Sequence, residues 1–511
     1  MKPISITQLP FPVPRFSTIT TSSYEHTSVL DATLSTSSSS ALDLVTSDIP
    51  INVDRDNSNN YARYPLVDED CDPLTFLLVD PSDQSFHFSP STVTNDRDLD
   101  DLFPSNSAAF FEQIHLDQLI RSAQAIESND QTLASDILSC LNSNLHSPVG
   151  PPLQRASFYF KEALQAFLLP LVQDDDGKID YVADAFSLSL STQDLVRKIS
   201  AFKSFSDLSP LPQFCSFTAN QSIIDAFIVG DHNFFSRPIH IIDFDIGLGG
   251  QWSSFLHEIA FRYKARVDVI FTPPPTVIIT AVVVDESLET NLMAVNLRDF
   301  AAGLGIRFDI ECIRVGGMGP AALGSIRLST EDNVVISFTP TVTMLLSDGG
   351  GGDMVDGFLR FVSRVAPRVV VFVDSESCCG ADSSQDQDQD RSFRMSFVAG
   401  LEYYSKVLES LDSAAAAVGF DEEQVKRIER ALIRPRIRTA VRSWGIRDLP
   451  WREMLKRIGF KPLGFSEFTE SQAVWLIGRA PIGGFHVARK DGSITMSWQG
   501  KEFSSTSAWK F

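Results

Sequence analysis

From about residue 237 onward, short runs of apolar residues alternate with longer segments whose apolar residues recur at helical spacing. The runs at 238–247 and 276–285 (PIHIIDFDIG and TVIITAVVVD) have the length of strands, and the segment at 250–264 between them has the length of a helix. Parallel strands that are covered by helices on both faces have this continuous apolar composition. The pattern predicts a mostly parallel α/β sheet of the Rossmann or methyltransferase type, with further strands at 306–313, 334–338 and 368–376.

The C-terminal part of the chain has a different pattern. The run AVWLIGRA (473–480) is predicted to be a strand, and residues 485–498 are predicted to form a hairpin that turns at Asp491–Gly492. A last strand is expected over 501–511. The parallel sheet is therefore expected to finish in antiparallel strands, as in nucleotide- and methyl-donor-binding folds.

The part of the chain before the sheet is expected to contain a tail and a helical region. Residues 1–108 are rich in Ser, Thr and Asp, which predicts a disordered acidic tail that resembles activation segments. Amphipathic segments follow within 109–235, at 116–126, 133–141 and 152–170. We therefore expect a mainly helical cap at 109–235 and an α/β core at 236–511.

Charge and motif content exclude several classes of protein. The net charge is −22, of which −11 lies in residues 1–108, so tight unaided binding to nucleic acid is not expected. The sequence lacks an apolar run of membrane-spanning length, a ligand-spaced Cys/His cluster and a GxSxG nucleophile motif. His240, inside an apolar strand, is interpreted as a hydrogen-bonded structural histidine. We expect no metal, no cofactor and no catalytic residues.

A glycine-rich turn is the strongest chemical candidate. Asp245, Gly247 and Gly249 follow the first predicted strand directly and precede a helix, where a backbone can approach a cofactor. Asp285 ends the next strand, where an acid could bind a ribose. One interpretation is an S-adenosylmethionine-dependent methyltransferase site. The other is a vestigial or structural turn, because Gln251 replaces the third glycine of the usual pattern.

A basic segment lies at 426–461, with 12 Lys/Arg and 3 Asp/Glu. It is most concentrated at Arg434, Arg436, Arg438 and Arg442. The segment predicts a patch for nucleic acid, an acidic partner or nuclear import, or else a solvated arginine-rich helix. Pro435 lies among these arginines and argues against one continuous recognition helix.

Several ordered motifs closely resemble those of the GRAS family of plant transcription regulators. Residues 239–243 (IHIID) resemble its VHIID motif, and leucine-rich segments at 116–167 and 288–313 flank this motif. The PFYRE-like and SAW-like regions follow in the family's order, and the resemblance covers about residues 109–511. The residues that match the motifs are His240, Ile241, Ile242, Asp243, Pro367, Tyr403, Tyr404, Trp451, Gly459, Trp498, Ser507, Ala508 and Trp509.

The branch of the family can also be identified by resemblance. Residues 202–227, 241–252 and 465–490 are similar to the HAIRY MERISTEM (scarecrow-like) group. The resemblance implies a nuclear regulator that is not an enzyme and acts in meristem maintenance and development. It implies WUSCHEL-type homeodomain partners or other transcription factors, GRAS homo- or heterodimers, and contact with DNA mainly through partners. Direct, sequence-specific DNA binding remains an alternative.

Overall fold

The computed structural model describes residues 104–169, 191–228, 236–265, 273–284, 286–315, 319–329, 332–346, 353–374, 392–446 and 451–511. The predicted disordered tail lies outside these residues, apart from its last few positions, which begin α2 (Pro104–Glu127), the first of the described helices. Asp285 lies outside them as well. None of the helices described is both long and apolar enough to cross a membrane.

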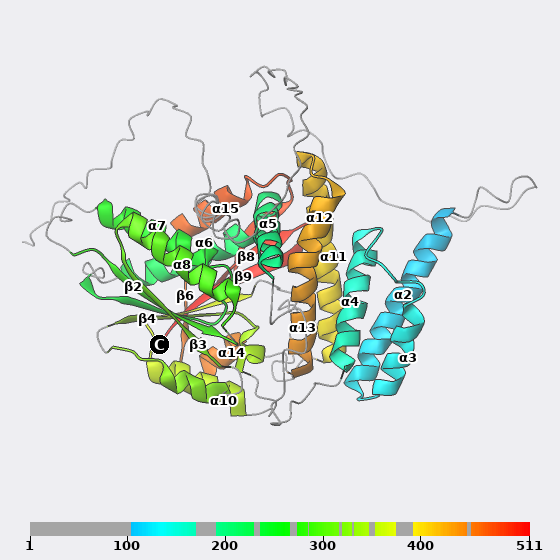
Figure 1. Ribbon diagram of the computed structural model, residues 1–511, viewed down its shortest axis with the longest axis horizontal. Coiled ribbons are helices and arrows are strands. Elements are labelled where there is room, and N and C mark those ends of the chain that lie inside the picture. Colours follow the sequence, from blue (N-terminus) through cyan, green and yellow to red (C-terminus); the bar gives the residue numbers. More distant parts are fainter. Residues whose placement is uncertain are drawn as a thin grey trace, which may run out of the picture.

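A nine-stranded sheet forms the α/β part of the molecule, in the left half of Figure 1. Its order is β3-β2-β1-β4-β5-β9-β8-β7, and the short β6 pairs with β9. The first five strands are parallel, and β9 is antiparallel to β5. This arrangement confirms the predicted parallel sheet that ends in antiparallel strands. The bounds are β1 Ile239–Asp243, β2 Thr276–Val283, β3 Arg307–Arg314, β4 Asn333–Phe338, β5 Val369–Asp374, β6 Lys461–Leu463, β7 Phe485–Lys490, β8 Ser493–Trp498 and β9 Lys501–Lys510.

Helices cover both faces of the sheet because its central strands are apolar on both sides. Along β1, Ile239 and Ile241 belong to one core, and Ile242 belongs to the core on the other face. The first core takes its helices from α6 (Leu211–Ile228), α7 (Gly250–Lys264) and α8 (Leu288–Leu304). The second takes them mainly from α10 (Asp353–Val365) and α14 (Trp451–Arg457). The shorter α9 (Val342–Leu346) and the 3-10 helix η2 (Gly319–Ser325) also contribute residues to this second core.

A bundle of helices stands beside the sheet (Figure 1). It combines helices from two distant parts of the chain, which share a third core. The expected boundary at residue 235 therefore does not separate the bundle from the sheet, because 393–446 joins the bundle and α6 covers the sheet. The bundle helices are α2 Pro104–Glu127, α3 Gln131–Leu141, α4 Pro152–Leu168, α5 Thr192–Leu208, α11 Phe393–Val418, α12 Glu422–Ile428, the π-helical turn η3 Glu429–Ile433, and α13 Arg434–Ile446.

The prediction of a strand over 473–480 is wrong. The helix α15 (Glu467–Ile477) occupies most of this run, and Ser466 caps its first turn by accepting from the backbone N–H of Thr469. Ala473 and Ile477, four residues apart, are buried, whereas Val474 and Trp475 are exposed. The apolar run is therefore one buried helical stripe beside an exposed one, and not a strand buried on both faces.

The expectation that Pro435 interrupts the helix is also wrong. Helical structure continues from α12 through η3 into α13, and the N–H of Arg434 bonds to the carbonyl of Glu429, five residues earlier. Pro435 follows this widened turn as the second residue of α13. Proline lacks a backbone N–H. After the change of hydrogen-bond register, the N–H at this position would have no helical acceptor, so its loss costs little.

The predicted hairpin is confirmed. β7 and β8 pair antiparallel, and Asp491 (φ 51°) and Gly492 (φ 77°) form its turn. Positive φ at both central residues is the requirement of a type I′ turn.

Candidate functional site

The candidate site lies where the strand order of the parallel sheet reverses, between β1 and β4. Ligands of doubly wound sheets bind outside the carboxyl ends of the strands at this point. Asp245 follows β1, and Thr339 follows β4. The hydroxyl of Thr339 donates to Oδ2 of Asp245 at 2.9 Å, so that one hydrogen bond spans the two sides of the reversal.

Asp243, the last residue of β1, is held beneath this turn. Its Oδ1 accepts from the backbone N–H of Asp245 at 2.9 Å, and its Oδ2 accepts from the indole Nε1 of Trp252. Burial raises the pKa of Asp243 to about 7, although both hydrogen bonds act in the opposite direction. Trp252 is fully buried. The pair fixes the start of α7 to the end of β1.

Asp245 is the solvent-reachable acid of the turn. The surrounding protein raises its pKa by desolvation, while the bond from Thr339 and the charges of Arg436 and Lys198 lower it. These two cations come from the bundle helices α13 and α5. Lys198 also bonds both carboxylate oxygens of Glu289 in α8, at 2.8 and 2.7 Å. The bundle therefore reaches the carboxyl edge of the sheet.

The two glycines of the turn differ in their surroundings. Both have positive φ, 51° at Gly247 and 77° at Gly249. A Cβ at Gly249 would lie 3.0 Å from Cγ of Met293 and 3.1 Å from Cδ1 of Leu297, whereas a Cβ at Gly247 would meet nothing within 4 Å. Gly249 thus allows α8 to pack against the turn, which favours the structural interpretation at this position.

His240 connects three strands through polar contacts. Its Nε2 lies 2.8 Å from Oγ1 of Thr280, and its Nδ1 lies 3.3 Å from Oδ2 of Asp332. Thr280 in turn donates to Oε1 of Glu311 at 3.2 Å. An acid, a histidine and a hydroxyl that contact one another in this order resemble a hydrolytic triad. Thr280 is fully buried and His240 is 3% exposed, so no substrate reaches them and the contacts hold the strands together.

The remaining motif residues are distributed over all three cores. Tyr403, Tyr404 and Trp498 lie in the bundle core, where the hydroxyl of Tyr403 donates to the carbonyl of Phe503 at 3.1 Å. Residues further along the sheet pack on its two faces, and Nε1 of Trp509 donates to Oγ of Ser507 at 3.0 Å. The motif residues therefore form no single site. The other buried motif residues are Ile241, Ile242, Pro367, Trp451 and Ala508, whereas Gly459 is exposed in the turn after α14.

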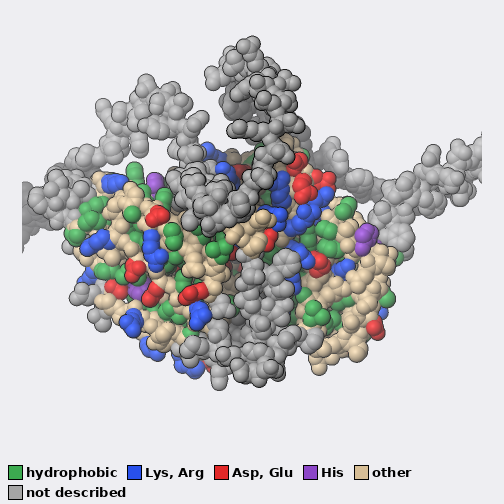
Figure 2. All heavy atoms as spheres, in the orientation of Figure 1, with side chains coloured by type: hydrophobic (Ala, Val, Ile, Leu, Met, Phe, Trp, Pro, Cys, Tyr) green, Lys and Arg blue, Asp and Glu red, His purple; other side chains and the backbone are tan. Residues whose placement is uncertain are grey.

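The four arginines of the predicted basic patch are partly buried in the bundle. Arg434 donates from Nε and Nη2 to the carboxylate of Glu162, at 2.9 and 3.0 Å. The guanidinium of Arg436 lies 5.9 Å from the ring centre of Phe205, and Arg438 and Arg442 line a hollow against α4. Figure 2 shows basic and acidic side chains interspersed over the described part of one face. These arginines contact protein groups, and a continuous nucleic-acid surface on them is not favoured.

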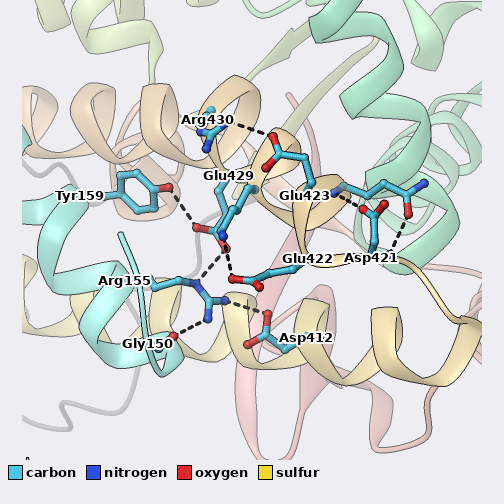
Figure 3. Close-up of polar contacts among 11 residues, drawn as sticks. Gly150, Arg155, Tyr159, Asp412, Asp421, Glu422, Glu423, Glu429 and Arg430 are labelled. Carbon is cyan, nitrogen blue, oxygen red and sulfur yellow. Dashed lines mark hydrogen bonds and ion pairs between the residues drawn. The ribbon is translucent and has the colours of Figure 1, made fainter. Parts of the chain in front are cut away.

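Sequence reasoning missed a buried ion cluster (Figure 3). Arg155 of α4 donates from Nε to Oε1 of Glu429 at 2.9 Å, and from Nη2 to Oδ1 of Asp412 at 2.8 Å. The hydroxyl of Tyr159 donates to Oε2 of Glu429 at 3.0 Å. The sequence offered two signals of this cluster, which are the charge of Arg155 and its position four residues before Tyr159. Their shared partner Glu429 lies more than 250 residues away in the chain. Within the described ranges, no group of three or more His, Cys, Asp or Glu could hold a metal.

Comparison with known proteins gives a consistent result. The family model of the GRAS domain family matches residues 115–510. Scarecrow-like protein 15 of Arabidopsis thaliana is 37% identical over 403 residues, which are 78% of this chain and 75% of that protein. Scarecrow-like protein 6 of the same plant is 34% identical over 403 residues, which are 77% of this chain and 62% of that protein.

A solved structure shows the same fold. The crystal structure of SCL7 in Oryza sativa has a TM-score of 0.51 and 22% identity, and the match covers 78% of this chain and 99% of the SCL7 chain.

Proposed function

Because the chain belongs to the GRAS domain family, we propose that it is a plant transcription regulator that acts through DNA-binding protein partners. The observation that carries this proposal is the family match over 115–510, which spans both the bundle and the sheet. The burial of the motif residues other than Gly459 supports it, because the buried residues build a framework and do not surround a reacting group. On this proposal the chain works in the nucleus, in the manner of the HAIRY MERISTEM group, in meristem maintenance and development.

The proposed partners are WUSCHEL-type homeodomain proteins or other transcription factors, together with a second GRAS chain. The arrangement of charge supports recruitment to DNA by partners. The chain is strongly acidic, and Arg434, the first arginine of the expected patch, is already paired with Glu162. The electrostatic attraction of this helix for a phosphate backbone is therefore weaker than its sequence suggests.

A pull-down tests the proposal. The full-length chain is immobilised and exposed to a panel of homeodomain and zinc-finger transcription factors, with nuclease present. We expect a homeodomain protein to be retained without DNA. Retention that disappears with nuclease would instead support direct DNA binding, and no retention by any panel member would contradict the partner proposal.

A methyltransferase remains a second candidate because Asp245 is reachable by solvent beside the open space at Gly247. Calorimetry with S-adenosylmethionine separates the two functions. Micromolar binding that is lost in both Asp245→Ala and Asp285→Ala would favour the enzyme. We expect no heat of binding at high protein concentration.

A further inference from the structure

The two ends of the sheet differ in how their outward backbone groups are used. β3 is the last strand at one end, and its odd-numbered residues face β2, as the N–H of Arg307 does by donating to the carbonyl of Pro275. Ile310 therefore turns its backbone outward. Its N–H donates to Oδ1 of Asp309 at 2.9 Å, and its carbonyl accepts from Nη2 of Arg298 at 2.6 Å. The middle of this edge is protected, because an added strand would have to displace both side chains.

β7 is the last strand at the other end, and its outward backbone groups are open. The carbonyl of Gly484 accepts from the N–H of Gln499 across the start of the β7–β8 pair, so the even-numbered residues of β7 face β8. The backbone groups of Phe485, Val487 and Arg489 therefore point away from the sheet. Among the described residues, β8 is the one strand that pairs with β7, and these outward groups have no hydrogen-bond partner.

The two faces of β7 have different surroundings. Phe485 and Val487 are half-buried against the bundle core. Arg489 lies on the same face and pairs with Glu470 of α15 at 2.7 Å, so α15 covers this side of the strand. A strand added to the edge would gain cover for one set of its alternate side chains. The exposed residues of the other face are His486, Ala488 and Lys490.

One segment of the N-terminal tail has the length and composition of a strand for this edge. Residues 74–79 (LTFLLV) lie outside the described residues, and their six positions equal the length of β7. Pro73 precedes the run, and Pro81 follows it after one aspartate. Proline has no N–H to donate to a ladder, so these two residues limit the paired length. The even-numbered residues of the run, two leucines and a phenylalanine, fall on one face of a strand.

The link between this segment and the described fold is long enough to reach β7. Residues 80–103 separate the segment from Pro104, where α2 begins. A link of this length extends to about 80 Å at most. A folded unit of about 400 residues is roughly 55 Å across. Because the segment and the edge belong to one chain, their effective concentration approaches about 1 mM, and even a weak contact is populated.

We propose that residues 74–79 add to the edge of β7 as a further strand, with their even-numbered side chains on the face that α15 covers. Main-chain hydrogen bonds to Phe485, Val487 and Arg489 hold the segment, as in other cases of strand addition to an open edge. Burial of the leucines and the phenylalanine against the α15 side stabilises the contact. While it is paired, the segment is withheld from other proteins. The contact lies within one chain and does not depend on the proposed function.

Amide hydrogen exchange of the full-length chain, resolved to single residues, tests the contact. The variant carries Phe76→Pro together with Leu77→Pro, because one of two neighbouring residues must face β7 in any register. We expect the outward amides of Val487 and Arg489 to exchange at least about tenfold faster in this variant than in the wild type. The amide of Ala488, which faces β8, should exchange alike in both proteins.

A matched control carries Phe86→Pro together with His87→Pro, elsewhere in the tail. It should leave the exchange of β7 unchanged, and all three proteins should melt together because neither pair lies within the described fold. Equal exchange of Val487 and Arg489 in the wild type and in the Phe76→Pro, Leu77→Pro variant would overturn the proposal. The same acceleration in the control would overturn the assignment to residues 74–79.

Dilution separates this contact from pairing between two copies of the chain. Protection within one chain is independent of protein concentration, whereas protection that falls on about tenfold dilution would assign the edge to a second copy and overturn the proposal. The measurement uses neither a DNA-binding partner nor a promoter. Its failure would therefore leave the pull-down and reporter predictions as they stand.

Discussion

Arg155 and Glu429 form a buried ion pair, at 2.9 Å, between helices that lie 274 residues apart in the chain. The side chain of Glu429 is 1% exposed and that of Arg155 is 10% exposed. Glu429 begins the π-helical turn that leads into α13, and it also accepts from Tyr159. The pair therefore joins the early and late halves of the bundle at the place where the helix changes register.

Removal of this pair should destabilise the protein strongly. Glu429→Gln leaves a buried guanidinium with one remaining carboxylate partner, Asp412, so we expect a loss of about 3 kcal/mol in unfolding free energy. Chemical denaturation measures it. The control is Glu423→Gln, which removes the exposed partner of Arg430 and should cost less than about 1 kcal/mol. Similar small losses in both variants would show that the buried pair contributes little.

Asp243 should make stability depend on pH. Its pKa is raised from 3.8 to about 7 in the folded protein, so between these values the folded state holds a proton that the unfolded state has released. Stability relative to Asp243→Asn should therefore decline as pH rises from about 4 to about 7, by at most about 1.4 kcal/mol per pH unit. Thermal denaturation of both proteins across this window measures it. Parallel profiles would contradict the raised pKa.

The two glycines of the turn should respond differently to a methyl group. Gly249→Ala adds contacts near 3 Å to Met293 and Leu297 as well as a left-handed backbone penalty, and should cost roughly 2–4 kcal/mol. Gly247→Ala carries the backbone penalty alone, about 1 kcal/mol. Comparison of their unfolding free energies tests the packing role of Gly249, which equal losses would refute.

The buried tryptophans should anchor the fold. Trp252 and Trp509 are 0% and 1% exposed, so Trp252→Ala or Trp509→Ala should cost about 3–5 kcal/mol. Trp475, at 58% exposure, provides the control and should cost little when it is replaced by Ala. A Trp509→Ala protein that melts with the wild type would show that the last strand is not anchored by this residue.

Local patterns in the sequence predict each strand or helix of this fold better than they predict which other residues it contacts. The apolar run around His240 and the Asp491–Gly492 turn specify a strand and a hairpin by their own composition, and both are confirmed. The run around Trp475 was wrongly predicted to be a strand, because an apolar sequence does not show which of its side chains are exposed.

The candidate site depends on contacts that local pattern does not contain. The position of Asp245 after a strand was evident, but its bond to Thr339 and its proximity to Arg436 require the tertiary fold. The same limit applies to Arg155 and Glu429, because nothing near either residue in the sequence identifies the other. Pro435 shows the converse, since the register change in the π-helical turn Glu429–Ile433 just before it removes its usual effect on a helix.

We propose that this chain changes transcription when it is brought to a promoter, without DNA binding of its own. The most direct measurement fuses the full-length chain to a heterologous DNA-binding domain in plant cells and reads a reporter that carries the matching site. We predict a severalfold change in reporter output, up or down, which requires that site. Unchanged output from a stably expressed nuclear fusion would contradict the account.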